Sequence, residues 1–297
     1  MTMMGVIPAM VTPMHSNNQV NFRALMKYAK WLVQYDIAGL FALGTTGEGL
    51  LIPRDDWART VLVTVQSAEG KCPVIIQCGG ASFPDTQWRI ETAVESGADA
   101  VAIIAPYFYR HSEKALERYF SEIFQRWPEV DFYLYNIPVY SNNVISPELF
   151  GTLFHRFANL KGIKDSTGSE KSLESFVRAA PDAVVYTGSE AILQEAYELG
   201  AAGSISGIAA ALPEIVISAW KDVETEDFAR AHQLKEAVNL FDSYSTIASV
   251  KAVLAELGFD VGKALPPLRT LDKSARVQLV QALADIGLDI KKLNLNS

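Results

Sequence analysis

The stretch Gly97-Ala98-Asp99-Ala100-Val101-Ala102-Ile103-Ile104-Ala105-Pro106 leads from a helix end into an almost continuous apolar run. Glycine commonly stops a helix just after its last turn. A strand that is covered on both faces of a parallel sheet is apolar throughout, whereas a half-exposed antiparallel strand alternates. The stretch therefore predicts a helix that is followed by a buried parallel strand at 100–106.

Eight such apolar runs recur along the chain, and amphipathic segments separate them. The runs cover residues 5–12, 39–44, 73–79, 100–106, 132–137, 160–166, 183–188 and 201–207. Alternating strands and helices favour a parallel sheet with right-handed crossovers. Eight strand–helix units predict an α/β fold in which the sheet closes into a (β/α)8 TIM barrel rather than staying open.

The part of the chain after the eighth run is expected to be purely helical. It contains four segments with helical spacing, at 213–223, 226–241, 247–257 and 274–286. One of them completes the barrel, and the rest form a C-terminal helical extension. Because no Gly/Ser/Pro linker or charge block intervenes, we expect a catalytic barrel at residues 1–223 and an extension at 224–297 packed on it.

The composition is that of an ordinary globular protein, with 49% hydrophobic and 20% charged residues. The formal net charge is −8, and an acidic chain without a basic run repels phosphate backbones, so we expect no nucleic-acid partner. No apolar run approaches the ~20 residues that span a bilayer, and no basic targeting region is visible. Two cysteines, Cys72 and Cys78, cannot form a disulfide scaffold. These features predict a cytoplasmic protein without membrane contacts.

Several standard catalytic motifs do not occur in the sequence. It contains no phosphate-binding G-x-x-x-x-G-K-[ST] loop, no G-x-S-x-G nucleophile elbow and no H-E-x-x-H zinc motif. The histidines are scattered, at positions 15, 111, 155 and 232. We therefore expect no metal site.

Barrel enzymes place their chemistry at the C-terminal ends of the strands. The loop Gly44-Thr45-Thr46-Gly47-Glu48 follows the second predicted strand. Gly44 and Gly47 let the backbone turn tightly and present N–H groups, and the two threonines add hydroxyls. Such a loop can hold a small carboxylate, although a plain strand-to-helix turn would have the same composition.

The fifth predicted strand carries Tyr133-Leu134-Tyr135-Asn136-Ile137-Pro138. Alternate residues of a strand share a face, so Tyr133, Tyr135 and Ile137 lie on one side. Tyr135 is the last tyrosine before the loop and can point into the barrel mouth as a proton donor. A purely structural aromatic ring is the alternative interpretation.

The sixth predicted strand carries two lysines, in Lys161-Gly162-Ile163-Lys164-Asp165-Ser166. Lysine is rare in buried strands because removing an ammonium from water is costly. An inward lysine near the C-terminal end can lose its proton and attack a carbonyl to form a Schiff base. Lys164 has that position, whereas Lys161 lies nearer the strand start. The alternative is a lysine that extends to solvent.

Taken together, the three motifs predict a site for an α-keto acid. Such a substrate needs donors for its carboxylate, an amine for its carbonyl and an acid/base for proton transfer. The three motifs, in order, also resemble those of the dihydrodipicolinate synthase / N-acetylneuraminate lyase family. This resemblance implies a class I, metal-independent pyruvate-handling barrel that is usually a homotetramer, a dimer of dimers. It implies that Lys164 forms the Schiff base, Tyr135 shuttles protons, Thr45 and Thr46 bind the carboxylate, and Ile205 packs against pyruvate.

Within this family, the sequence differs from two of the branches. Synthases carry an arginine where this chain has Tyr140, and a second tyrosine where this chain has Phe108. Sialate lyases have a Gly-Ser-Thr-Gly-Glu loop, whereas this chain has Thr45. Their Tyr-Asp-Glu cluster is replaced here by Gly188-Ser189-Glu190-Ala191.

The motifs most resemble the 2-keto-3-deoxy sugar-acid aldolases, in which Arg110, Ser166 and Glu190 would contact the sugar hydroxyls. We therefore expect a lyase that cleaves such an acid reversibly to pyruvate and an aldehyde without an external cofactor. The alternatives are 4-hydroxy-tetrahydrodipicolinate synthase, N-acetylneuraminate lyase, or a related dehydratase. The non-enzymatic alternative is a relative that binds a keto acid without catalysing a reaction.

Overall fold

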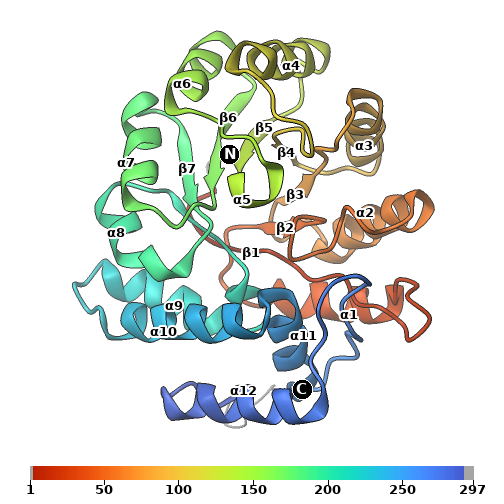
Figure 1. Ribbon diagram of the computed structural model, residues 1–297, viewed down its shortest axis with the longest axis vertical. Coiled ribbons are helices and arrows are strands. Elements are labelled where there is room, and N and C mark those ends of the chain that lie inside the picture. The colour runs from red at the N-terminus through yellow and green to blue at the C-terminus, as the bar shows by residue number, and fades with distance from the viewer. Residues whose placement is uncertain (1–2, 291–297) are drawn as a thin grey trace.

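Within residues 3–290, which the computed structural model describes, eight parallel strands form one sheet in the order β1-β8-β7-β6-β5-β4-β3-β2. The sheet closes between β1 and β2, where Ala9 and Phe41 form a parallel bridge and the Met10 N–H donates to the Phe41 carbonyl at 2.8 Å. The expected (β/α)8 TIM barrel is confirmed (Figure 1). The strands are β1 (Gly5–Pro8), β2 (Leu40–Ala42), β3 (Val74–Gln77), β4 (Ala100–Ile104), β5 (Phe132–Asn136), β6 (Leu160–Asp165), β7 (Val184–Thr187) and β8 (Gly203–Ser206).

Strand β4 shows why the runs are almost continuously apolar. Ala100, Ala102 and Ile104 belong to the apolar cluster inside the barrel, whereas Val101 and Ile103 belong to the cluster between the sheet and the helices. Successive side chains of a strand point to opposite faces, and here both faces are buried. A continuous apolar sequence is the consequence.

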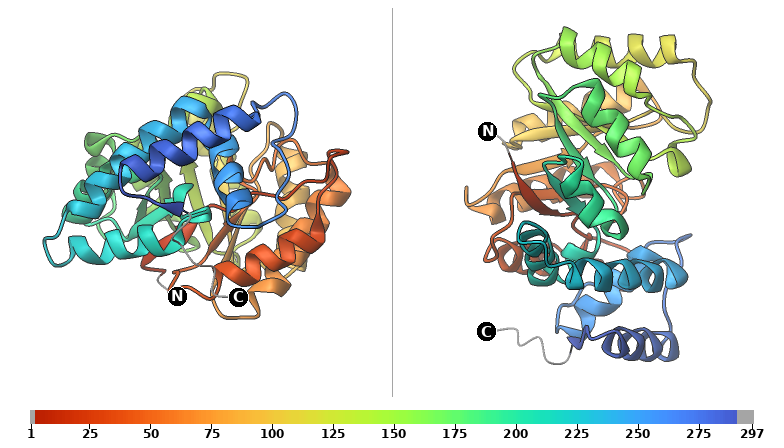
Figure 2. Two further views of the ribbon diagram at one scale, coloured as in Figure 1. Left: turned by 90° about the horizontal axis from the view of Figure 1, so that it is seen from below. Right: turned by 90° about the vertical axis from the view of Figure 1, so that its left-hand side faces the viewer.

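Helices surround the barrel on its outer side (Figures 1 and 2). The helix after Ser146 has a clear local start, because the Ser146 hydroxyl accepts from the Leu149 N–H at 3.0 Å and Pro147 occupies the first turn. The barrel helices are α1 (Phe22–Leu32), α2 (Arg54–Ala68), α3 (Phe83–Glu95), α4 (Glu113–Arg126), α6 (Pro147–Arg156), α7 (Glu170–Ala179), α8 (Leu193–Glu198) and α9 (Pro213–Val223). Shorter turns are α5 (Pro138–Ser141), η1 (Glu190–Ile192) and η2 (Ile208–Ala210).

The C-terminal extension consists of α10 (Ala229–Tyr244), α11 (Thr246–Glu256) and α12 (Lys273–Asp285), which lie together on one side of the barrel (Figure 2). Helix α10 begins later than residue 226 because Glu226 has a φ of 60°, outside the right-handed helical region. Leu234 and Val253 join the same apolar cluster as the outer faces of the barrel strands. The division of the chain at residue 223 therefore stays a prediction. In the described residues, no helix is both long and apolar enough to cross a membrane.

Candidate active site at the barrel mouth

Lys164 lies on β6 beside Tyr135 on β5, and the two residues are direct partners in the sheet register. The Lys164 residue is 5% exposed. Its Nζ is 4.6 Å from the centre of the Tyr135 ring and 4.9 Å from the centre of the Phe41 ring. The lysine that the sequence singled out therefore ends between two aromatic rings at the C-terminal end of the barrel interior.

The Tyr135 hydroxyl reaches the loop that follows β2. It lies 3.2 Å from Thr45 Oγ1, a hydrogen bond in which either oxygen can donate. The Tyr135 ring also packs edge-on against Phe41 of β2, with the ring centres 5.9 Å apart. Three strand ends thus bring an amine, a phenol and a threonine hydroxyl together. These are the groups that addition to a carbonyl followed by proton transfer requires.

The loop 44–49 is tightly folded. Leu43 and Glu48 both adopt left-handed conformations, with φ of 60° and 56°, and this ends β2 earlier than the predicted run. A Cβ on Gly47 would lie 2.9 Å from the Met10 carbonyl oxygen, so only glycine fits there. The Thr12 hydroxyl donates to the Gly47 carbonyl at 2.6 Å. Gly47 is therefore placed to shape the loop that carries Thr45 and Thr46.

The side chains of Ser166 and Lys164 both lie against Gly188, which follows β7. A Cβ on Gly188 would lie 1.9 Å from Ser166 Oγ and 2.8 Å from Lys164 Cε. Thr46 Oγ1 lies 3.7 Å from the place of a Cβ on Gly207, which follows β8. Gly188, to which the sequence alone assigns no role, leaves the space that the lysine side chain occupies.

Asn136 and Asp165 hold the ends of β5 and β6 together. Asn136 Nδ2 donates to Asp165 Oδ1 at 2.8 Å, and the Thr167 hydroxyl donates to Asp165 Oδ2 at 2.7 Å. Asn136 Oδ1 in turn accepts from the Ile145 N–H at 3.1 Å. The sequence alone assigns neither residue a role. Their position directly after Tyr135 and Lys164 could have identified them as partners, because polar residues at buried strand ends need hydrogen bonds.

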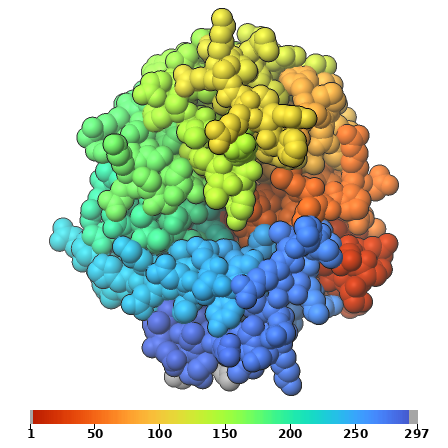
Figure 3. Space-filling view, viewed as in Figure 1, coloured from red at the N-terminus to blue at the C-terminus, as the bar shows by residue number. Residues whose placement is uncertain are grey.

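The remaining predicted site residues occupy different depths. Ile205 is fully buried inside the barrel. Glu190 is buried at the rim, where Oε1 accepts from the Ser206 hydroxyl and from the Ile208 N–H at 3.0 Å. Arg110 lies on the exposed loop after β4, and its Nε donates to Asn142 Oδ1 at 3.3 Å. The segments 106–111 and 138–144 therefore lie side by side above the mouth (Figure 3).

Other candidate groups lie away from this site. Lys161 Nζ donates to the Ala158 carbonyl at 2.9 Å and pairs with Asp131 at 3.4 Å, at the start of β6. Burial raises the pKa of the Cys78 thiol, which makes it an unreactive core residue. No group of three His, Cys, Asp or Glu residues that could hold a metal occurs within positions 3–290.

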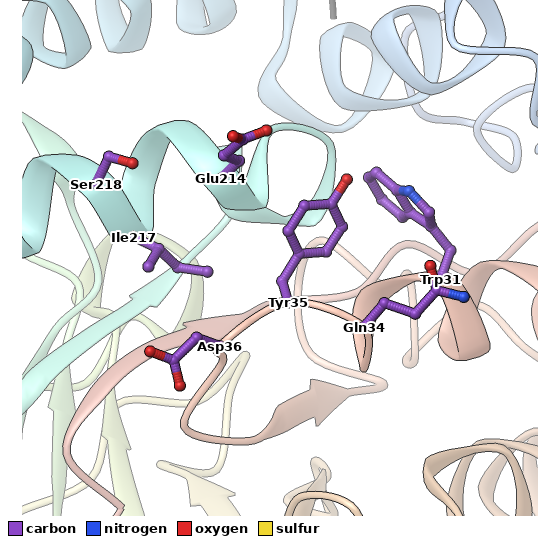
Figure 4. A pocket seen from close by; sticks show the side chains of 7 residues that line it. All are labelled: Trp31, Gln34, Tyr35, Asp36, Glu214, Ile217 and Ser218. Atoms are coloured by element: carbon purple, nitrogen blue, oxygen red, sulfur yellow. The ribbon is translucent and has the colours of Figure 1, made fainter. Parts of the chain in front are cut away.

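A cavity of about 430 Å³ lies where the end of α1 meets α9 (Figure 4). Its lining includes none of the predicted site residues. The residues that line it are Trp31, Gln34, Tyr35, Asp36, Glu214, Ile217 and Ser218. The strand ends around Lys164 therefore remain the candidate active site.

A comparison with models of protein families shows the family to which the chain belongs. The model of the Dihydrodipicolinate synthetase family matches residues 2–286. The chain belongs to this family. Relatives within this family include a DapA-like lyase and 4-hydroxy-tetrahydrodipicolinate synthases, so this chain is an enzyme of the lyase type.

Individual relatives match over almost the whole chain. An uncharacterized DapA-like lyase from Halobacterium salinarum is 30% identical over 288 residues, covering 96% of this chain and 94% of that protein. The 4-hydroxy-tetrahydrodipicolinate synthase of Mesorhizobium japonicum is 26% identical, with 96% and 98% covered. The structure of YagE, a prophage protein of the same family from E. coli K12 solved with pyruvate, has a TM-score of 0.90 and 26% identity. The match covers 96% of this chain and 99% of the YagE chain.

Proposed function

We propose that this protein is a Schiff-base-forming, pyruvate-dependent lyase that cleaves a 2-keto-3-deoxy sugar acid reversibly to pyruvate and an aldehyde. The observation that carries the proposal is the group at the mouth. Lys164 Nζ lies 4.6 Å from the ring of Tyr135, whose hydroxyl is 3.2 Å from Thr45 Oγ1. The pyruvate complex of YagE supports pyruvate as the shared ligand.

The first half of the proposed reaction forms a covalent imine. The substrate carboxylate binds to the loop that carries Thr45, Thr46 and the Gly47 N–H. The Lys164 amine attacks the C2 carbonyl, and the Tyr135 hydroxyl gives its proton to the departing oxygen, so that water leaves and the protonated imine forms. The side chain of Ile205 inside the barrel packs against the methylene side of the bound acid.

The second half breaks the carbon–carbon bond. Tyr135, assisted by Thr45 and the substrate carboxylate, takes the proton of the C4 hydroxyl. The C3–C4 electron pair moves into the imine and leaves an enamine, and the C4 carbon departs as the aldehyde. Return of a proton to C3 and hydrolysis of the imine then release pyruvate and restore the Lys164 amine. No external cofactor takes part.

The residues beyond the keto-acid end support a sugar acid as the substrate. Arg110 is exposed above the mouth, Ser166 lies next to Lys164, and Glu190 has a second carboxylate oxygen for a hydroxyl group. We propose that these three residues bind the polyhydroxylated tail. A panel of keto-deoxy acids assayed for pyruvate release tests this, and Arg110→Ala should raise KM for the best acid without weakening imine formation from pyruvate.

The second candidate is 4-hydroxy-tetrahydrodipicolinate synthase, the activity named for the M. japonicum relative. Tyr140, 66% exposed, stands where the synthase pattern has arginine, so the carboxylate of aspartate semialdehyde lacks a bidentate partner. A charge-assisted hydrogen bond contributes roughly 1.5–3 kcal/mol, which is about one to two decades in rate. We expect kcat/KM for a keto-deoxy acid to exceed that for aspartate semialdehyde plus pyruvate. A tenfold advantage for the semialdehyde would replace the aldolase proposal with the synthase.

Covalent trapping separates the enzyme from a protein that only binds a keto acid. Incubation with pyruvate and sodium borohydride should add a reduced pyruvyl group irreversibly, and peptide mapping should locate it on Lys164. A binding protein without imine chemistry would gain no mass.

We further propose a cytoplasmic homotetramer built as a dimer of dimers. Large apolar side chains exposed on the segments beside the mouth support burial by a second copy. They are Phe108, Tyr109, Val139 and Tyr140, each between 66% and 78% exposed. Light scattering after size-exclusion chromatography tests this, and a mass of one chain would exclude it.

A further inference from the structure

A buried ion pair lies under the loop that carries Thr45 and Thr46. Glu48 closes this loop, and Lys251 lies on α11 of the C-terminal extension. Lys251 Nζ is 2.5 Å from Glu48 Oε1, and the two side chains are 3% and 0% exposed. Burial lowers the pKa of the Lys251 ammonium, and the Glu48 carboxylate opposes that change.

Each member of the pair also binds a backbone group of a third segment. Glu48 Oε2 accepts from the Leu265 N–H at 2.5 Å, and Lys251 Nζ donates to the Lys263 carbonyl at 2.9 Å. The pair therefore joins the loop after β2, helix α11 and residues 263–265. Figure 3 shows the blue C-terminal segment lying against the orange N-terminal part of the barrel.

The ion pair is a costly way to fill this space. Two charges lose their water on burial, and an apolar pair of similar volume often stabilises a protein as well or better. What an apolar pair cannot do is accept from one fixed N–H and donate to one fixed carbonyl. The arrangement therefore determines the position of Glu48 rather than contributing mainly to the free energy of unfolding.

The position of Glu48 determines that of Thr45. The Glu48 N–H donates to the Thr45 carbonyl at 3.1 Å, and Thr45 Oγ1 meets the Tyr135 hydroxyl. Glu48 has a φ of 56°, a conformation that is unfavourable for a residue with a Cβ. The side-chain contacts with Lys251 and Leu265 hold the loop in this conformation.

We propose that Glu48 and Lys251 are positioning residues, which hold the Thr45–Thr46 loop in the conformation that binds the carboxylate of the keto acid. The C-terminal extension thereby takes part in substrate binding without contacting the substrate. This inference rests on the proposed function, because it assigns the keto-acid carboxylate to that loop.

The test measures the pyruvate concentration that gives half-maximal borohydride trapping in Glu48→Gln, Lys251→Met and the double variant E48Q/K251M. Each single variant should raise this concentration at least tenfold while Lys164 is still labelled at saturating pyruvate. The two effects should not add, because either change alone breaks the same pair. The double variant leaves no unpaired buried charge, so it keeps the test valid if a single variant fails to fold.

Leu153→Ala serves as the matched control. Leu153 is fully buried in α6 on the outer layer, so its truncation lowers Tm without disturbing the loop, and half-maximal trapping should stay at the wild-type concentration. Folded variants of the pair that trap pyruvate at the wild-type concentration would overturn the inference. If the wild-type protein traps no pyruvate at all, the proposed function itself fails.

Discussion

Gly188 provides a test of the site that depends on shape alone. Alanine in its place puts a Cβ 1.9 Å from Ser166 Oγ and 2.8 Å from Lys164 Cε. The Ser166 hydroxyl must rotate away, and Lys164 Cε must move from 2.8 Å to an ordinary contact of 3.4 Å, a shift of about 0.6 Å. The tip of a lysine moves at little cost in stability, so the effect should fall mainly on the chemistry.

The magnitude follows from the size of the shift. A misplacement of about 1 Å costs roughly 10²-fold in rate, so a shift of about 0.6 Å should slow imine formation by roughly 10- to 100-fold. Added volume in a packed site costs about 1–3 kcal/mol of stability, and Ser166 carries most of this because it has the shorter contact. The double variant Gly188→Ala/Ser166→Gly should therefore regain Tm but not rate.

The assay follows the rate of borohydride trapping at saturating pyruvate, together with Tm and the rate of pyruvate release from the best keto-deoxy acid. Ser166→Gly alone reports what the serine side chain itself contributes. A trapping rate for Gly188→Ala within twofold of wild type would show that the lysine does not occupy the space beside Gly188 during the reaction, and the proposed geometry would be wrong.

The remaining predictions concern the amine, the phenol and the buried tyrosines. Lys164→Ala should abolish turnover and trapping, and an adduct mapped to Lys161 in the wild-type protein would contradict the assignment. Tyr135→Phe should slow turnover roughly 10²–10⁴-fold while Tyr133→Phe leaves it nearly unchanged; equal effects would remove Tyr135 from the mechanism. Burial raises the pKa of Tyr119 and of Tyr133 to about 12. Because ionisation is less favourable in the folded protein, each buried tyrosine stabilises it fully below pH 10. This contribution to the free energy of unfolding is lost between pH 10 and 12 and amounts to at most about 2.7 kcal/mol per tyrosine. The difference in urea unfolding between pH 9 and pH 11 should contain about half of this loss for each tyrosine, about 1.4 kcal/mol, and Tyr119→Phe should reduce the difference by that amount.

The barrel could be predicted because its constraints are local and repeated. Each strand has two buried faces, so the runs are almost continuously apolar, and eight repeats indicate closure. Element ends were less predictable, because single residues decide them. Leu43 ends β2 and Glu226 delays α10, each by a left-handed conformation that their residue types do not announce.

The side chains of the proposed active site could be placed together from the sequence, but the residues that support them could not. Strand ends in a closed barrel converge, so Lys164, Tyr135 and Thr45 had to be near one another. The Glu48 carboxylate meets the Leu265 N–H across 217 residues of sequence, and nothing near either residue announces the other. Long-range pairs of this kind depend on how the extension packs, which no local pattern determines.

Two tyrosines of one strand show that depth in the barrel, and not residue type, separates the proposed proton donor from a structural tyrosine. Alternation turns both Tyr133 and Tyr135 into the interior. Tyr133 packs against Tyr186 with ring centres 5.9 Å apart, and the Tyr186 hydroxyl donates to the Met3 carbonyl at 2.5 Å, just before β1. Two residues further along the strand, a rise of roughly 6.6 Å, the Tyr135 hydroxyl meets Thr45 instead. A tyrosine on this face therefore reaches the proposed active site only at the last inward position of the strand, which is where the proposed proton transfer to a Lys164 imine requires it.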